Sequence, residues 1–135
     1  MKAFVCVDDN CGMAFLGKRQ SRDSRVLDDI ISISSGSLVY MTERTKKLFP
    51  NTDFAIASEI TDQILSSDEY YFFETESPIG YLDSIDEIVM YRWNRRYPSD
   101  LKLGFSPNDS EYTRVSVIEF IGTSHDLITK EVYKK

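Results

Sequence analysis

The segment YRWNRRYPSD, residues 91–100, holds the densest group of side chains in this chain that could do chemistry. Trp93 and Tyr91 lie among three arginines there, and Arg95 follows Trp93 by two positions. Arginine and aromatic side chains together stack on nucleic-acid bases, clamp phosphate groups, and are enriched at protein interfaces. The segment therefore predicts a surface for a protein or a small ligand. Its alternatives are a packed strand end, whose arginines pair with surface acids, and an RNA-binding strip.

A second basic stretch, GKRQSRDSR, spans residues 17–25. We interpret it as a solvated, mobile loop; alternatively, it is a lid that contributes a cation to an anionic ligand. RNA binding would require this stretch and residues 92–96 to share one face of the molecule. The formal net charge of -6 argues against nucleic acid, because nucleic-acid binders usually carry a basic face.

Nucleophilic and metal-binding side chains are scarce. The only histidine, His125, lies in TSHD, where the pattern predicts a hairpin turn. Its neighbours Ser124 and Asp126 are contiguous with it, whereas the members of a catalytic triad come together from separated positions. One histidine also excludes the usual zinc sites, so no metal site is predicted. Cys6 is expected in a buried strand and Cys11 in a partly exposed turn, both as reduced thiols.

Length and composition are those of one globular domain. The chain has 135 residues, of which 41% are hydrophobic and 28% charged, so it can bury a core and is not of the disordered class. No apolar run is long enough to cross a bilayer, and the N-terminus lacks the long apolar stretch of a signal peptide. We therefore expect a cytoplasmic α/β domain over residues 1–135 with no membrane partner. Walker A, G-x-G-x-x-G and G-x-S-x-G motifs are absent, so no motif indicates a reaction class.

Apolar periodicity predicts alternating strands and helices. Apolar residues recur on one face over residues 24–33, which predicts a helix capped by Asp23 or Ser24. Residues 13–23 are expected to be irregular, with Gly17 as a breaker. The predicted strands are 2–7, 37–41, 53–58, 69–74, 87–93, 101–105, 111–120 and 127–133, and the other predicted helices are 42–48, 59–66 and one that begins at 77–78. This order favours an α/β fold with a mixed, mainly parallel sheet flanked by helices and a C-terminal antiparallel hairpin.

This order and spacing resembles dihydrofolate reductase over nearly the whole chain. KAFVCVDDNCGMAF is similar to that family's first strand and the mobile loop after it, with Asn10 and Gly12 in the loop. VYM at 39–41 followed by Thr45, DFAIAS, EIVMYRW and the closing KEVYKK are similar to later elements of the family. The resemblance implies a shortened, degenerate dihydrofolate reductase-like fold.

The family's cofactor motifs are altered in this sequence. In the family, a Gly-Arg-x-Thr segment at a helix N-terminus grips the cofactor phosphate. The matching segment, TERT at 42–45, keeps Thr45, displaces Arg44 by one position and adds an acid. The family's Gly-Gly pair falls on Phe73 and Glu74, a bulky ring and a carboxylate. We therefore expect no cofactor, with NADPH as the alternative if these departures are tolerated.

The family's pterin site is also altered. An acid on the first helix of the family hydrogen-bonds the pterin, and the candidates here are Asp23, Asp28 and Asp29. Asp23 lies nearest the helix start, where it would equally serve as the N-cap, while the other two are expected on the solvated face. The late-strand Thr that lines the family's pterin pocket falls on Tyr91, whose ring could partly fill that pocket.

We therefore expect a non-catalytic module that binds a small molecule or a protein on a dihydrofolate reductase-like scaffold. The candidate binding residues are Asn10, Gly12, Asp23, Arg44, Thr45, Tyr91, Trp93 and Arg95. One alternative is an NADPH-dependent reductase acting on dihydrofolate or a pterin-like substrate. It requires an open cleft between the first strand and the first helix, with Asp23 pointing into it. The other alternative is RNA binding through YRWNRRYP, residues 91–98.

Overall fold

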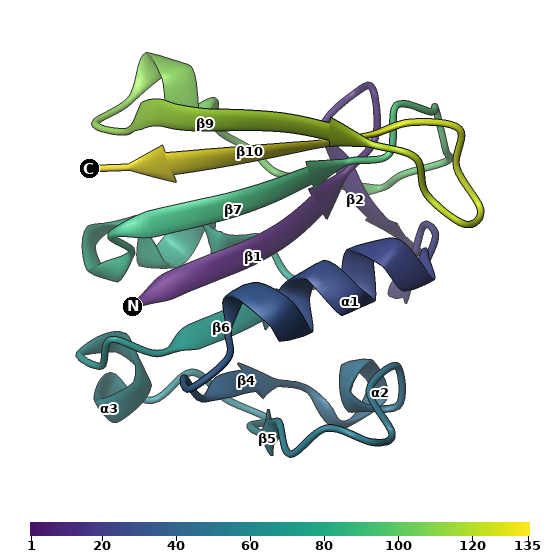
Figure 1. Cartoon of the computed structure of the whole chain (residues 1–135). Helices are drawn as coiled ribbons and strands as arrows, with labels where there is room; N and C mark the ends of the chain where they lie inside the picture. The colour runs from purple at the N-terminus through teal and green to yellow at the C-terminus, as the bar shows by residue number, and fades with distance from the viewer.

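A seven-stranded mixed sheet runs through the computed structural model, which describes all 135 residues. Its order is β5-β4-β6-β1-β7-β10-β9, and the first five strands are parallel to one another (Figure 1). The last two strands form an antiparallel hairpin that pairs with β7. The strands are β1 Lys2–Val7, β4 Val39–Met41, β5 Ala55–Ile56, β6 Tyr70–Phe73, β7 Glu87–Arg92, β9 Thr113–Phe120 and β10 Ile128–Lys134. The predicted fold class is confirmed.

The helices begin at side-chain caps. Helix α1 spans Ser24–Ile33, as its apolar face predicted, because Asp23 accepts a hydrogen bond from the backbone N–H of Arg25 and caps it. Thr42 and Thr61 cap two single-turn helices in the same way. These are α2 Glu43–Lys46 and α3 Asp62–Leu65, and two 3-10 helices follow, η1 Pro78–Ser84 and η2 Pro107–Asp109. The segment after residue 77 is therefore helical, but in the tighter 3-10 form.

A second, three-stranded sheet was not foreseen from the sequence. It has the order β3-β2-β8 and is built from β2 Gly12–Phe15, β3 Lys18–Arg19 and β8 Leu101–Lys102. The expectation of irregular chain over residues 13–23 is wrong here, because Leu16 and Gly17 form a tight hairpin turn. Both have positive φ, 52° and 73°, as a two-residue hairpin turn requires. Gly17 therefore reverses the chain between two strands.

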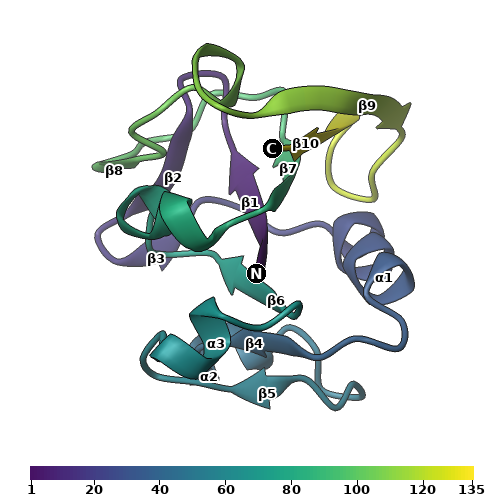
Figure 2. The same ribbon diagram turned by 90° about the vertical axis from the view of Figure 1, so that its left-hand side faces the viewer.

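Helix α1 lies on one side of the main sheet, and β2, β3 and β8 lie on the other (Figure 2). Two apolar clusters fill the two faces of this sheet. On β1, Phe4 and Cys6 point towards α1, while Val5 and Val7 point to the opposite face, as the alternation of a strand requires. Cys6 is buried as predicted, and burial raises the pKa of its thiol well above the ordinary value. None of the helices has the length and apolar character needed to cross a membrane.

Candidate functional site

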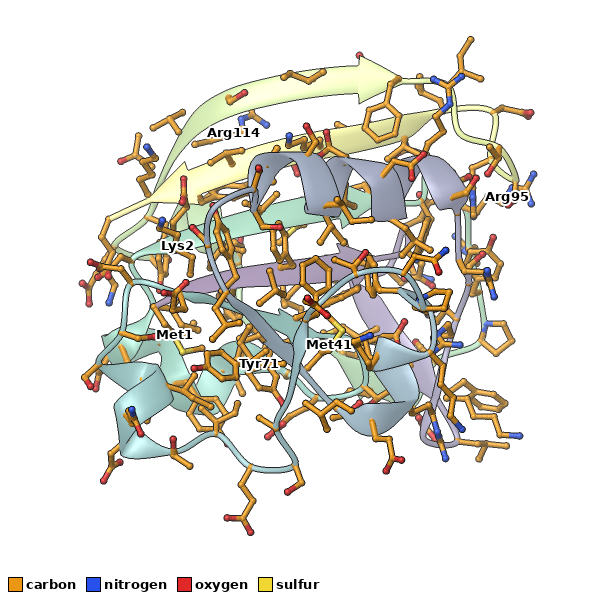
Figure 3. The ribbon with its side chains drawn as sticks, turned by 60° about the horizontal axis from the view of Figure 1, so that its bottom comes forward. Met1, Lys2, Met41, Tyr71, Arg95 and Arg114 are labelled. Atoms are coloured by element: carbon orange, nitrogen blue, oxygen red, sulfur yellow. The ribbon has the colours of Figure 1, made fainter.

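The carboxyl ends of β1 and β7, the N-terminus of α1 and the loop at 121–127 meet at one edge of the main sheet, on the right in Figure 1. In open parallel sheets this is the edge where ligands bind. The loop that contains Arg95 lies at this end of the molecule, opposite Met1 and Lys2 (Figure 3). Three polar clusters and one cavity occupy the edge.

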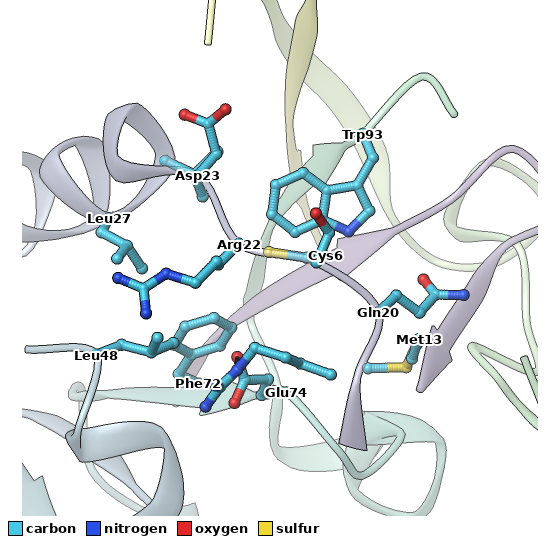
Figure 4. Close-up of a pocket in the computed structure, with 13 residues that line it drawn as sticks. Cys6, Met13, Gln20, Arg22, Asp23, Leu27, Leu48, Phe72, Glu74 and Trp93 are labelled. Carbon is cyan, nitrogen blue, oxygen red and sulfur yellow. Dashed lines mark hydrogen bonds and ion pairs between the residues drawn. The ribbon is translucent and has the colours of Figure 1, made fainter. Parts of the chain in front are cut away.

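The cavity lies between β1 and α1 and is nearly closed. Its volume is about 10 Å³, which is room for about one water molecule. Trp93 stands over Cys6 on one side, and the Arg22 side chain lies between Leu27 and Leu48 on the other (Figure 4). The full lining is Cys6, Met13, Arg19, Gln20, Ser21, Arg22, Asp23, Val26, Leu27, Leu48, Phe72, Glu74 and Trp93. The Arg22 guanidinium is exposed and forms no hydrogen bond or ion pair, so it is free to leave this position.

Asp23 lies at the edge of this cavity, but its carboxylate points away from it (Figure 4). Besides the N-cap bond from Arg25, it accepts hydrogen bonds from the backbone N–H groups of Thr123 at 3.0 Å and Ser124 at 2.8 Å. Nδ1 of His125 lies 3.0 Å from its Oδ2. Burial alone would raise the pKa of Asp23, but the hydrogen bonds outweigh it and hold that pKa well below its ordinary value.

His125 lies in the predicted turn, but its ring is buried, with only 3% of the residue exposed. The ring stacks on Trp93, with centroids 4.7 Å apart. Its Nε2 lies 2.9 Å from the Tyr97 hydroxyl and 3.1 Å from the Ser21 hydroxyl, and Tyr97 also donates to Ser21 at 3.3 Å. His125 is thus a turn residue, as predicted, but its ring is buried in a hydrogen-bond network that the sequence did not indicate. These contacts could not be predicted from the sequence, because the hydrogen-bond partners of His125 lie 28 and more than 100 positions away in the chain.

A second cluster surrounds Glu74, which follows β6 and is buried. Its carboxylate accepts a hydrogen bond from the Thr45 hydroxyl at 2.8 Å and pairs with Nε of Arg19 at 2.7 Å. Arg44 lies beside this pair, since its carbonyl accepts from Arg19 at 3.4 Å, and its own guanidinium donates to the Gly17 carbonyl at 2.9 Å. Two of the predicted binding residues, Arg44 and Thr45, thus lie in this cluster, and both side chains already form hydrogen bonds within the protein.

The third cluster is the loop after β1, which Asp8 organises. Its carboxylate accepts from the backbone N–H groups of Asn10, Gly12 and Tyr97 at 2.9, 2.7 and 3.0 Å. Burial opposes ionisation, but these bonds lower the pKa of Asp8. A Cβ on Gly12 would lie 2.6 Å from Oγ of Ser99, so glycine is required there for close packing. The two predicted loop residues, Asn10 and Gly12, are thus held in a packed turn.

The remaining predicted residues lie apart from the cavity. Tyr91 is buried beneath α1 and donates to Asp29 at 2.6 Å, and the Lys130 ammonium lies 2.8 Å from the same carboxylate oxygen. Burial, followed by the hydrogen bond and charge of Asp29, raises the pKa of Tyr91 far above its ordinary value. Arg92 is paired with Glu131, whereas Arg95 is exposed. Of the eight predicted residues, only Asp23 and Trp93 line the cavity.

Comparison with known proteins finds a similar fold but no similar sequence. No family model matches the chain, and no curated protein matches it. Among solved structures, it is similar to dihydrofolate reductase from Enterococcus faecalis complexed with NADP(H) and RAB-propyl. The TM-score is 0.70 at 9% sequence identity, and the match covers 98% of this chain and 94% of that one. The fold is that of dihydrofolate reductase.

The positions that the resemblance aligns with the family's cofactor motifs hold a buried carboxylate and a buried ring. Glu74 holds a buried carboxylate beside Thr45, and Phe73 is fully buried in the second core cluster between Tyr71 and Tyr81. The Glu74 carboxylate is paired with Arg19, and Lys18, Arg19 and Arg44 together line one surface hollow. The hydroxyl of Thr45 donates a hydrogen bond to Glu74.

Proposed function

We propose that this chain is a ligand-binding module on a dihydrofolate reductase-like scaffold, and that it does not reduce dihydrofolate with NADPH. The observation that carries the proposal is the small, mostly apolar cavity at the sheet edge, lined on one side by the exposed and unpaired Arg22 side chain. The reductase alternative required an open cleft with Asp23 pointing into it. The cavity has room for only about one water molecule, and the Asp23 carboxylate is bonded to the 123–125 loop.

The first helix offers no free carboxylate to a pterin. The residues of α1 that face the cavity are Val26 and Leu27, both buried and apolar. Asp28 is exposed, and Asp29 is engaged by Tyr91 of β7 and Lys130 of β10. The Enterococcus faecalis structure is described as complexed with NADP(H), whereas Phe73 and Glu74 stand here where the resemblance places the family's Gly-Gly pair.

The cavity favours a small ligand with an apolar group and an anionic end. Its walls are Cys6, Val26, Leu27, Phe72 and Trp93, which suit a short hydrocarbon group. The ligand would displace Arg22 from between Leu27 and Leu48, and the freed guanidinium could then pair with an anion at the mouth. Oε1 of Gln20, also in the lining, is buried and accepts no hydrogen bond, so it can take one from the ligand.

Tryptophan fluorescence tests this proposal directly, since Trp93 is the only tryptophan of the chain and lies in the cavity wall. Hexanoate is the probe, and 1-hexanol, which has the same hydrocarbon chain and no charge, is its control. We expect hexanoate to change Trp93 fluorescence and raise the melting temperature, 1-hexanol to bind more weakly, and Arg22→Gln to lose the difference between the two. Equal binding of both, or none, would overturn the proposed ligand chemistry.

Thermal shifts with NADPH and dihydrofolate test the other half of the proposal. A ligand at ~100 times its dissociation constant stabilises the folded state by about 2.7 kcal/mol, which raises the melting temperature of a domain this size by on the order of 10 °C. We expect neither compound to produce such a shift. A clear shift with either one would reinstate a reductase.

A further inference from the structure

Three side chains at the mouth of the cavity stand in the relation of a nucleophile, a base and an orienting carboxylate. Oγ of Ser21 lies 3.1 Å from Nε2 of His125, and Nδ1 of the same ring lies 3.0 Å from Oδ2 of Asp23. They come from the segment before α1 and from the loop between β9 and β10, which lie more than 100 positions apart in the chain. Hydroxyl, imidazole and carboxylate in this order form the constellation that activates a serine.

The proton positions follow from the chemistry of the partners. A carboxylate only accepts hydrogen bonds, so the proton on Nδ1 of His125 is donated to Asp23 and Nε2 carries a lone pair. Nε2 has one lone pair, and the Ser21 hydroxyl at 3.1 Å and the Tyr97 hydroxyl at 2.9 Å both lie within reach of it. Ser21 donates to Nε2 when the Tyr97 hydroxyl donates instead to Ser21, which lies 3.3 Å from it. Trp93, stacked on the imidazole, holds the plane of the ring. His125 is thus set as a base towards Ser21.

The surroundings of Ser21 suit a carbonyl substrate. Ser21 is half-buried and lines the cavity, so an acyl group that entered there in place of the Arg22 side chain would lie against this residue. The backbone N–H groups of Ser21 and Arg22 donate no hydrogen bond within the protein, and the Arg22 guanidinium is free. These groups are donors available for the negative charge that develops on a carbonyl oxygen during acyl transfer.

We propose that Ser21 is an activated nucleophile that hydrolyses a small carboxylic ester, an inference that rests on the cavity being the ligand site. Oγ of Ser21 attacks the carbonyl carbon as its proton moves to Nε2 of His125. Collapse of the tetrahedral adduct expels the alcohol, which takes that proton and leaves an acyl ester on Ser21. Water then adds, passing one proton to Nε2, and the acid departs as the proton returns to Oγ. Ester and water become acid and alcohol. Ser21 and His125 are the catalytic residues, and Asp23 is a positioning residue.

A fluorophosphonate probe tests the nucleophile, because it reacts covalently with activated serines. We expect one adduct on the full chain, mapped to Ser21 by mass spectrometry, and hydrolysis of p-nitrophenyl hexanoate above the background rate. Ser21→Ala should abolish both, and His125→Gln should lower both rates by ~100-fold or more. Ser24→Ala is the matched control, because Ser24 lies three positions away and bonds only to Thr123, and it should react like the wild type.

The role of Asp23 is tested by finding which ring nitrogen of His125, the only histidine of the chain, carries the proton. In the wild type, Oδ1 of Asp23 accepts two hydrogen bonds from backbone N–H groups, and Oδ2 accepts one. In Asp23→Asn, the side-chain NH₂ group must take one of these two positions, and Oδ2 is the position where fewer backbone bonds are lost. The NH₂ group therefore replaces Oδ2 and donates to Nδ1 of His125, which moves the ring proton to Nε2. Nitrogen-15 NMR should show Nδ1–H in the wild type and Nε2–H in Asp23→Asn, together with loss of labelling.

The outcomes separate this inference from the proposed function. A folded wild type that binds hexanoate but gives no fluorophosphonate adduct refutes the nucleophile and leaves the binding module intact. An adduct that persists in His125→Gln, or one at Ser24, also refutes it. An adduct at Ser21 without hexanoate binding supports the nucleophile and refutes the ligand chemistry of the cavity.

Discussion

Replacing Asp23 by alanine should destabilise the fold strongly, because one carboxylate holds α1 and the 121–127 loop together. It caps the helix through Arg25 and accepts from Thr123, Ser124 and His125, while only 1% of the residue is exposed. Loss of an N-cap costs about 1 kcal/mol. Each further donor left without an acceptor costs ~1 kcal/mol or more, the lower end applying where water can reach the loop.

The expected loss for Asp23→Ala is therefore about 3 to 4 kcal/mol, or a fall in melting temperature on the order of 10 °C or more. Urea unfolding followed by circular dichroism measures the free energy directly. Asp28→Ala is the control, because Asp28 is exposed on the same helix and forms no hydrogen bond or ion pair; its effect should stay within about 0.5 kcal/mol. A loss below ~1 kcal/mol for Asp23→Ala, or an equal loss for both variants, would refute the idea that this carboxylate joins the helix to the loop.

Three other perturbations follow from single contacts. The lowered pKa of Asp23 stabilises the fold fully above about pH 4, its range in an unfolded chain, and this contribution is lost as pH falls towards the folded value. The stability gap between wild type and Asp23→Ala should therefore be flat from pH 7 to 5 and shrink below pH 4 in urea titrations; a gap that widens on acidification would contradict it. Gly12→Ala should cost ~1–3 kcal/mol, because its Cβ would lie 2.6 Å from Oγ of Ser99, whereas Gly80→Ala meets nothing within 4 Å and should cost at most about 1 kcal/mol by thermal unfolding. Glu131→Gln should cost ~1–3 kcal/mol, because Glu131 is buried and its carboxylate pairs with both Arg92 and Arg114; an unchanged urea midpoint would show that the two arginines find other partners.

The scaffold and the site have different relations to dihydrofolate reductase. The fold is retained across nearly the whole chain at 9% identity, because a core needs only apolar residues of suitable size at the right spacing. At the sheet edge, the carboxylates of Glu74, Asp8 and Asp23 accept specific hydrogen bonds, which apolar residues of similar size could not accept. Function follows from these contacts and not from the fold.

Most helices and strands of the main sheet could be predicted from the sequence, because the interactions that specify them act between residues close in the chain. Helix α1 was predicted to the residue, since an apolar face and an N-cap act within a few positions. The long C-terminal hairpin was predicted because β9 and β10 are neighbours in the chain and alternate clearly. Strand β5 was predicted as six residues but pairs over only two, because its sole partner, β4, is three residues long.

Tertiary structure alone decided the second sheet and the site. Strand β2 pairs with β8, which lies more than 80 positions further along, and no local pattern specifies such a partner. The sequence placed Asp23 as an N-cap or a ligand, and marked His125 as a turn residue with only contiguous partners. Folding brought the loop after β9 onto the start of α1, and so joined Ser21, Asp23 and His125 in one network. Hydrogen bonds between residues this far apart depend on the packing of the whole sheet, which no window of the sequence contains.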